Sequence, residues 1–357
     1  MKKLTRRDAI RMGVGTIGAL GAASFLPRDL NAYPFKNSTV AAVRGDDLMA
    51  MTRDALDALG GMNTIIEPGD TVFIKPNFVS FPWAKTNRCF HAGECTKPEI
   101  IITVIEECLK AGAVKVIVGE GSHLPTFDWQ YAITLDGRTD LRKEARRLST
   151  VYPGSVSLAC LETASPSWTE LPTRTRHGHI AVSTLAATAD KIISIPVAKT
   201  HSWAQVTLAA KNFIGITPLS RYAQLVDNTW WNRGSFDHSS PRAIARVYLD
   251  IVRGLKPDLS IIDFSIGIEG DGPTRSWGGR TIDMKERIGS WGLIASTDMM
   301  AADATAVRIM DHDPAKIAHL AMGSEMDLGE IQDQAINIVG ENIDNLRSVW
   351  KPAELKG

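Results

Sequence analysis

The sequence has no excess of either charge, which separates it from proteins whose main partner is a polyanion. Lysine plus arginine number 40 and aspartate plus glutamate number 40, so the formal net charge is zero. Proteins that bind nucleic acids or anionic membranes usually carry a basic excess. The balance therefore argues against both partners, and any recognition must come from local groups of charge.

Cysteine is scarce, and its spacing argues against two kinds of metal site. Cys89, Cys95, Cys108 and Cys160 fit neither a ferredoxin-type cluster nor a paired Cys-x-x-Cys zinc site. We therefore expect no iron–sulfur cluster in this chain. Two alternatives stay open for the first pair: a disulfide between Cys89 and Cys95, or a metal site that adds His91. Cys108 falls within a helical apolar pattern and is expected in the core.

Two motifs of common enzyme classes are also missing. No Gly-x-Ser-x-Gly elbow occurs, so serine hydrolase chemistry has little support. The glycine-rich turn at 267–273 lacks both the Gly-x-Gly-x-x-Gly spacing and an early strand position, which makes it a poor dinucleotide fingerprint. Its glycines instead suit unusual backbone angles close to a ligand.

The N-terminal residues are typical of an export signal. Lys2 and Lys3 precede the segment Thr5-Arg6-Arg7-Asp8, and a glycine- and alanine-rich apolar run covers 13–26. Paired arginines before such a run match a twin-arginine signal, whereas the run is too short and too rich in glycine to span a bilayer stably. We expect residues 1–32 to be a signal peptide cleaved after Ala32. The twin-arginine translocase is then a partner during export, the location is periplasmic, and no stable membrane anchor is expected.

The rest of the chain alternates between strand and helix patterns. Short apolar, β-branched runs predict strands, and apolar residues at helical spacing predict helices between them. The clearest strands are expected at 39–43, 71–74, 114–118, 192–195, 259–262 and 291–295, and the clearest helices at 46–59, 98–112, 241–255 and 299–310. This pattern predicts an α/β fold: a mixed, mostly parallel sheet with helices on both faces and a ligand site at the strand carboxyl ends.

The stretch 192–215 is expected to form the centre of the site. Its β-branched strand reaches Pro196, which has no N–H for a strand ladder, and Lys199 and His201 follow. Thr200 or Ser202 is expected to cap a helix that begins near Trp203. One straight helix would separate His201 from Lys211 by roughly 15 Å. Either the ligand is long or the segment is not one helix; the alternative is that these groups are solvated lysines and a capping histidine.

Other polar residues follow or lie near the carboxyl ends of predicted strands, where open α/β sheets bind their ligands. They are Lys75, Asn77, Glu120, Asp263, Glu269 and Asp303. The cations suit a carboxylate or phosphate, and the acids could hold a divalent metal. The structural alternative is that the acids form ion pairs with the lysines. The aromatic segment 221–240 contains Arg233 and His238. It is either a candidate lid over the pocket or a loop that packs its own tryptophans onto the surface.

Seven short motifs follow one another along residues 33–357. They are KPN from Lys75, TKPEII from Thr96, VIVGEGS from Val116, PVAKTHSW from Pro196, TLAAKNFIG from Thr207, KPDLSIIDFSIGIEGDGP from Lys256 and STDMMAAD from Ser296. In this order they resemble the DUF362 family over nearly the whole of that range. The resemblance implies one DUF362-type α/β domain, and a division into two lobes near 150–180 is left open. Some members carry ferredoxin modules, which this chain lacks. The resemblance also marks Lys211 and Asn212 as positions to test.

The residues support two main hypotheses. The first is an exported enzyme that acts on a small anionic ligand, with His201 and Lys199 as catalytic groups. In it the substrate-binding residues are Lys75, Asn77, Lys211, Asn212 and His238, and the ligands of a divalent metal are Glu120, Asp263, Glu269 and Asp303. The second is a non-catalytic periplasmic protein that binds a metal or an anion. A loose likeness in layout to racemases that hold a metal-containing cofactor gives a third, weaker idea.

Overall fold

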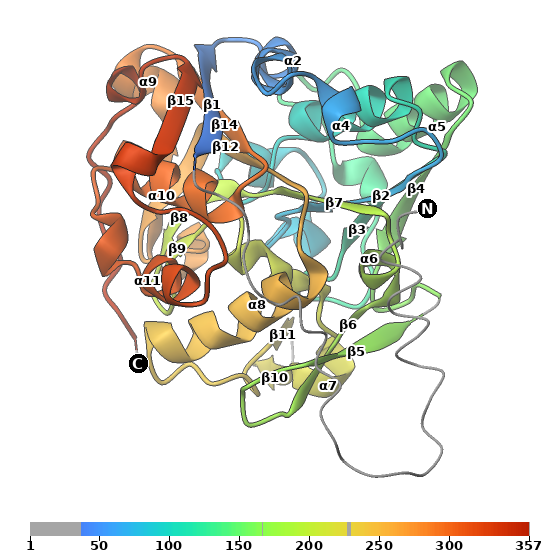
Figure 1. The fold of residues 1–357 in the computed structure, drawn as a ribbon. Helices are drawn as coiled ribbons and strands as arrows, with labels where there is room; N and C mark the ends of the chain where they lie inside the picture. Colours follow the sequence, from blue (N-terminus) through green and yellow to red (C-terminus); the bar gives the residue numbers. More distant parts are fainter. Residues whose placement is uncertain (1–36, 166, 227–229, 357) are drawn as a thin grey trace, which may run out of the picture.

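The computed structural model describes residues 37–165, 167–226 and 230–356 (Figure 1). The expected signal peptide, residues 1–32, lies outside the described residues. Within these ranges we find no helix that combines the length and the apolar character needed to cross a membrane. Strands and helices alternate along most of the chain.

In the described chain, eleven strands form one large sheet, and eight of them lie in the order β15-β1-β14-β12-β7-β2-β3-β4. Their bounds in chain order are β1 Ser38–Gly45, β2 Thr71–Pro76, β3 Lys115–Glu120, β4 Ser155–Cys160, β7 Lys191–Ile195, β12 Leu259–Gly270, β14 Trp291–Ser296 and β15 Ile336–Gly340. The other three, β8 (Val197–His201), β9 (Gln205–Thr207) and β13 (Gly279–Asp283), pair with β12 or with each other. Two hairpins, β5 (Trp168–Pro172) with β6 (His179–Ser183) and β10 (Gln224–Val226) with β11 (Trp230–Asn232), form separate small sheets.

Most neighbouring strands of the large sheet run parallel. The strands β4, β3, β2, β7 and β12 form a continuous parallel series, whereas β14 is antiparallel to both β12 and β1. Parallel strands covered on both faces need apolar side chains throughout. In β7, Ile192, Ile193 and Ile195 are fully buried. The structure confirms the predicted α/β class with a mixed, mostly parallel sheet.

Helices cover both faces of the sheet (Figure 1). Successive residues of a strand point to opposite faces, so Val72 packs in one hydrophobic cluster with Ile101 and Phe73 packs in another with Tyr248. The first face carries α2 (Leu48–Ala58), α4 (Pro98–Lys110) and α5 (Leu141–Val151), and the second carries α6 (Thr184–Ala187), α8 (Pro241–Leu255), α10 (Met299–Ile309) and α11 (Ala318–Glu325). The remaining short helices are α3 (Arg88–His91), α7 (Leu219–Tyr222) and α9 (Met284–Ile288).

Side-chain caps fix the starts of the two helices that lie behind the site. Ser240 Oγ accepts a hydrogen bond of 3.2 Å from the Ala243 N–H at the start of α8. Asp298 Oδ1 accepts bonds of 2.9 and 3.1 Å from the first N–H groups of α10. The second cap sets where α10 begins, and with it the place of Asp303 one turn later.

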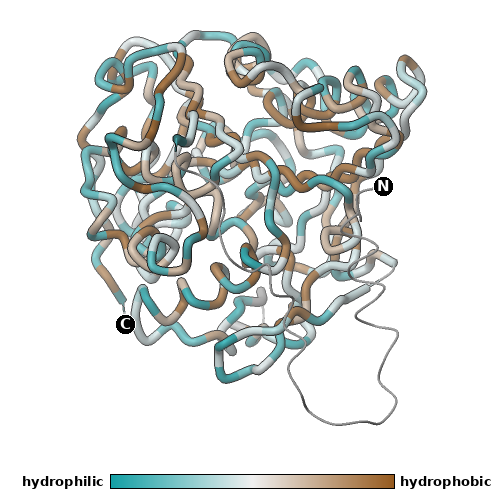
Figure 2. The backbone as a smooth tube through the Cα atoms, in the orientation of Figure 1, coloured by the Kyte–Doolittle hydropathy of each residue, from teal (hydrophilic) through white to brown (hydrophobic). Residues whose placement is uncertain are grey.

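Hydropathy follows this layered arrangement. Figure 2 shows hydrophobic segments along the central strands and more hydrophilic segments in the peripheral loops. Polar side chains nevertheless interrupt the buried strands at their carboxyl ends, where Lys75, Lys199 and His201 are each less than a tenth exposed. Buried cationic and imidazole groups need partners or a ligand, so this end of the sheet is the place to look for a site.

Candidate functional site

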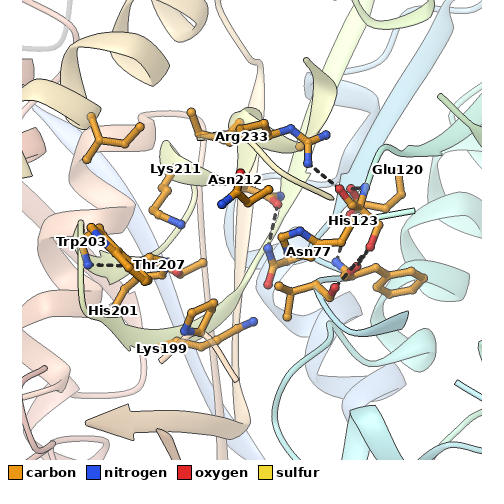
Figure 3. Close-up of a pocket in the computed structure, with 18 of the residues that line it drawn as sticks. Asn77, Glu120, His123, Lys199, His201, Trp203, Thr207, Lys211, Asn212 and Arg233 are labelled. Atoms are coloured by element: carbon orange, nitrogen blue, oxygen red, sulfur yellow. Dashed lines mark hydrogen bonds between the residues drawn. The ribbon is translucent and has the colours of Figure 1, made fainter. Parts of the chain in front are cut away.

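A cavity of about 330 Å³ opens at the carboxyl ends of β2, β3 and β8 (Figure 3). Its size suits a small molecule. The titratable groups among the described residues that line it are Lys75, Glu120, His123, Lys199, His201, Lys211, Arg233 and His238. The lining is therefore rich in cationic and imidazole groups, and Glu120 is its only carboxylate in the described part of the chain.

The structure brings eight of the eleven proposed site residues to this one cavity. They are Lys75, Asn77, Glu120, Lys199, His201, Lys211, Asn212 and His238. Asp263, Glu269 and Asp303 do not line it. Lys75 and Lys199 thus line one cavity, and Asp263, which was expected to share it with them, does not.

The helix expected to begin near Trp203 is wrong, and the reason lies in strand pairing. After Pro196 the chain resumes as β8, whose Val197 and Lys199 pair with β12. A turn then leads into β9, so β8 and β9 form a hairpin in which Lys199 lies opposite Thr207. The chain next enters a 3-10 helix at Lys211–Ile216. This return, rather than a straight helix, brings Lys211 to the same cavity as His201.

Lys75 and Glu120 form a buried ion pair on one side of the cavity. Lys75 Nζ lies 2.7 Å from Glu120 Oε2 and 2.6 Å from the Pro76 carbonyl. Glu120 Oε2 also accepts from the Phe78 N–H, and Oε1 accepts from the N–H groups of Gly121 and Ser122. Four donors use the lone-pair positions that a carboxylate offers. Glu120 is therefore a structural anchor with no free position for the metal that we expected there.

Burial lowers the pKa of Lys75, and Glu120 partly offsets that effect. Gly215 covers the ion pair: a Cβ atom there would lie 2.9 Å from both Glu120 Oε1 and Lys75 Nζ. That distance is shorter than real Cβ contacts. A glycine is needed at position 215 because any side chain there would overlap the Lys75–Glu120 ion pair.

Two further acids of the expected metal site are held by separate structural partners. Asp263 lies 3.2 Å from Lys97 Nζ, and both side chains are fully buried. Glu269 lies 2.7 Å from Arg287 and accepts a bond of 2.9 Å from the Lys351 N–H. These acids do form ion pairs, as the alternative held, but not with Lys75 or Lys199.

Asp303, the last of the four acids, supports the segment that carries Lys211. From α10 its two carboxylate oxygens accept the N–H groups of Ala209 and Ala210, at 2.7 and 3.1 Å. His319 Nε2 of α11 lies 3.0 Å from Asp303 Oδ2. The expected site built from four carboxylates is therefore not formed. More generally, the described residues contain no group of three or more histidine, cysteine, aspartate or glutamate residues that could hold a metal ion.

A backbone carbonyl group holds the side chain of Lys199. Its Nζ donates to the Glu94 carbonyl at 2.5 Å. Burial lowers the pKa of Lys199 to about 8, although the nearby acidic groups of Cys95 and Glu94 oppose this shift. Cys89 and Cys95, for which a disulfide was one alternative, are both buried free thiols in the structure. His91 instead lies beside the Leu135 carbonyl, with Nε2 at 3.1 Å.

Lys211 is the unpaired cation of the cavity. In the part of the chain that the structure describes, its Nζ has neither a hydrogen bond nor an ion pair. Burial lowers the pKa of Lys211 to about 7, and the positive charges of Lys199 and Arg233 lower it further in the same direction. The lowered pKa increases the share of Lys211 side chains that are neutral amines near pH 7. Lysines desolvated beside other cations are the type that act as bases or nucleophiles.

The two histidines beside Lys211 are set in opposite tautomers by the backbone. His201 Nδ1 accepts the Trp203 N–H at 3.1 Å, so the neutral ring carries its proton on Nε2. His238 Nδ1 lies 2.8 Å from the Phe236 carbonyl, which can only accept, so this ring keeps Nε2 as an acceptor. Burial lowers the pKa of both rings, and Lys211 adds to the effect. His201 therefore offers a donor and His238 an acceptor.

Several lining residues were missed by the sequence reasoning. Arg233, noted there only within the aromatic segment, donates from Nη2 to the Thr217 carbonyl at 2.9 Å and from Nη1 to the Ser122 carbonyl. These bonds tie Arg233 to Ser122, in the turn after β3, and to Thr217. Trp203 and Trp277 meet edge to face, with ring centroids 5.1 Å apart. Among the described residues, Thr207 Oγ1 and Asn77 Oδ1 are buried without a partner.

The fold and the cavity define this chain as an α/β protein with a cationic pocket at the strand ends. It belongs to the family described as "Domain of unknown function (DUF362)", whose sequence profile matches residues 72–308. All the cavity residues named above fall inside that range.

Three known proteins are similar to the chain. The thylakoid-associated protein sll1697 of Synechocystis sp. is 28% identical over 282 residues, which is 79% of this chain and 75% of that protein. The lactate racemase apoprotein of Thermoanaerobacterium thermosaccharolyticum is 12% identical with a TM-score of 0.44, over 76% of this chain and 57% of that one. A Thermotoga maritima protein is 15% identical with a TM-score of 0.39, over 79% of this chain and 60% of that one.

Proposed function

We propose that the chain is an exported enzyme that acts on a small anionic substrate held in the cavity. The observation that carries this proposal is the imbalance of charge in the lining. Three lysines, one arginine and three histidines face the cavity, and the one carboxylate among its described residues is already paired with Lys75. A carboxylate or phosphate would offset this excess of positive charge.

The hydrogen-bond partners support a division of roles. Lys75 and Lys199 are engaged by Glu120 and the Glu94 carbonyl, which favours a role in holding the anion. Asn77, Asn212 and His238 add polar contacts. His201, expected to carry a proton, has its Nδ1 occupied, so we assign its Nε2–H to a substrate oxygen. Lys211 then becomes the group that reacts, because no partner in the described chain holds its amine.

A binding experiment with matched lysine variants tests the proposal. Isothermal titration with small carboxylates and phosphates should give binding to the wild type that weakens with salt. Lys199→Met and Lys211→Met should weaken it strongly. Lys115→Met removes the same charge from an exposed position at the amino end of β3 and should leave binding unchanged. Equal affinity in all four proteins would refute an anion site in the cavity.

Turnover decides between an enzyme and the alternative, a non-catalytic binding protein. Each ligand that binds should be incubated with the protein and followed by NMR. Loss of the ligand's signals, abolished in Lys211→Met, would support catalysis. Recovery of every bound ligand unchanged would favour the binding protein instead.

The proposal of export rests on the pair Arg6 and Arg7 before the apolar run. Cell fractionation of the full chain should place it in the periplasm, and Arg6→Lys with Arg7→Lys should hold it in the cytoplasm. A periplasmic fraction that is the same with and without the arginine pair would exclude the twin-arginine route.

A further inference from the structure

Lys211 differs from the other two cavity lysines in what surrounds its amine. Lys75 Nζ contacts Glu120 and the Pro76 carbonyl, and Lys199 Nζ contacts the Glu94 carbonyl. Lys211 Nζ has no such partner among the described residues, and its strongest charged neighbours are cations. Burial beside other cations favours the neutral, nucleophilic form of the Lys211 amine.

The backbone that carries this amine is fixed. The two residues before Lys211, Ala209 and Ala210, donate their N–H groups to Asp303. Asp303 is itself fully buried and held by His319. A nucleophile must be held at a set place relative to its target for covalent chemistry. Asp303 holds Lys211 in this way, through the two N–H groups that precede it in the chain.

One face of the β8–β9 hairpin offers the groups that a carbonyl compound with a carboxylate would need. Lys199 and His201 are two residues apart on β8, so their side chains share a face, and Thr207 lies opposite Lys199 on β9. Figure 3 shows these three with Lys211 on the same side of the cavity. Thr207 Oγ1 is buried and has no partner in the described chain, which leaves a hydroxyl for a ligand.

We propose that the substrate is a small oxo acid and that Lys211 captures its carbonyl carbon as an imine. The assignment rests on the proposed function, since Lys199 would hold the carboxylate of that acid. Both the His201 Nε2–H and the Thr207 hydroxyl are available to the carbonyl oxygen.

The chemistry balances without a further reactant. The neutral Nζ attacks the carbonyl carbon, the C–N bond forms, and the π electrons move to oxygen, which takes up a proton as nitrogen loses one. The nitrogen lone pair then forms the C=N bond, and the hydroxyl group leaves as water after taking a proton from solvent. The product is a protonated imine and one water. Its positive nitrogen withdraws electrons from the neighbouring carbon, which suits proton removal or loss of a carboxyl group there.

Reductive trapping tests this capture on the full chain. The protein is incubated with pyruvate or glyoxylate and cyanoborohydride, and the product is measured by intact and peptide mass spectrometry. We expect one adduct per chain, on Lys211, with a mass equal to the oxo acid less one oxygen atom. Lys115→Met should give the same adduct. Trapping that is equal in wild type and Lys211→Met, or spread over surface lysines, would overturn the proposal.

Two further measurements separate failure of the imine from failure of the anion site. Lys211→Arg keeps the charge but cannot form an imine, so it should bind lactate by titration and give no adduct. If the wild type binds lactate but no oxo acid is ever trapped, the imine fails and the anion site stands. If neither lactate nor an oxo acid binds, both fail. If acetone is trapped as readily as pyruvate, the carboxylate is not recognised and the assignment of an oxo acid is overturned.

Discussion

A single substitution can measure how much Asp303 stabilises the segment 209–211, which carries Lys211. In Asp303→Asn one carboxylate oxygen becomes an NH₂ group, which cannot accept a hydrogen bond. If the NH₂ replaces Oδ1, the Ala209 N–H loses its acceptor, and if it replaces Oδ2, the Ala210 N–H does. His319 can adapt in the second case, because its Nδ1 is unpaired among the described residues and can take the ring proton. Each orientation thus leaves at least one buried N–H unsatisfied.

The number of unsatisfied N–H groups gives the expected loss in the free energy of unfolding. One buried donor without a partner costs ~1–3 kcal/mol, so the free energy of unfolding should fall by about that amount in Asp303→Asn. Urea denaturation followed by both fluorescence and circular dichroism gives the value and checks for a two-state transition. Asp54→Asn, at an exposed position of α2, is the matched control and should change the free energy by less than ~0.5 kcal/mol.

The same variant also tests whether Asp303 positions Lys211, apart from its effect on the free energy of unfolding of the whole protein. Because Ala209 and Ala210 precede Lys211, the loosened segment should slow oxo-acid trapping at temperatures where the protein is fully folded. If unfolding free energy and trapping both match those of the Asp54→Asn control, Asp303 does not hold this segment and the reasoning fails. If added EDTA lowers the stability of the wild type but not of Asp303→Asn, Asp303 binds a metal after all.

Three other outcomes are expected from the site. The rate of trapping should rise with pH, with a midpoint at about 7, because the amine of Lys211 is protonated and unreactive below its lowered pKa. Lys199→Met should move the midpoint to higher pH, because it removes a positive charge near Lys211. A midpoint near that of surface lysines would contradict this prediction. His201→Phe should weaken the binding of an oxo acid by ~0.5–1.5 kcal/mol, or roughly two- to tenfold in Kd by titration, since a donor to the carbonyl oxygen is lost; unchanged affinity would remove His201 from the site. Gly215→Ala should lower the free energy of unfolding by ~1–3 kcal/mol in a urea titration, because the added methyl group overlaps the Lys75–Glu120 pair; a neutral effect would mean that the chain can move away from the pair.

The sequence was sufficient for the parts of the fold that depend on local pattern. The β-branched run Ile192, Ile193 and Ile195 indicates a buried strand, and the helical spacing of apolar residues indicates the helix at 241–255. It also indicated the end of the sheet where polar groups gather. What it could not give was strand direction, because β14 has the same apolar run whether it pairs parallel or antiparallel.

Within the site, the errors come from partners that are distant along the chain. Pro196 suggested the end of a strand, but β12 pairs with the residues after it. Asp263 could have held a metal or a cavity lysine, and only the fold shows that it meets Lys97. Asp303 accepts hydrogen bonds from backbone N–H groups, and because nearly every residue has one, the sequence does not show which of them it meets. For Arg233 the one signal in the sequence is its position in an aromatic segment that follows the predicted strand ends.

The placement of the first and last strands has a consequence for how the family can diversify. β1 and β15 pair with each other at one margin of the sheet, where β14, β12 and β7 separate them from β2, and neither contributes a residue to the cavity. The lining comes from Lys75 to Trp277, and the support that lies beyond it comes from α10 and α11 through Asp303 and His319, not from these two strands. Relatives are therefore expected to tolerate substitutions in β1 and β15 without any change in the lining of the cavity.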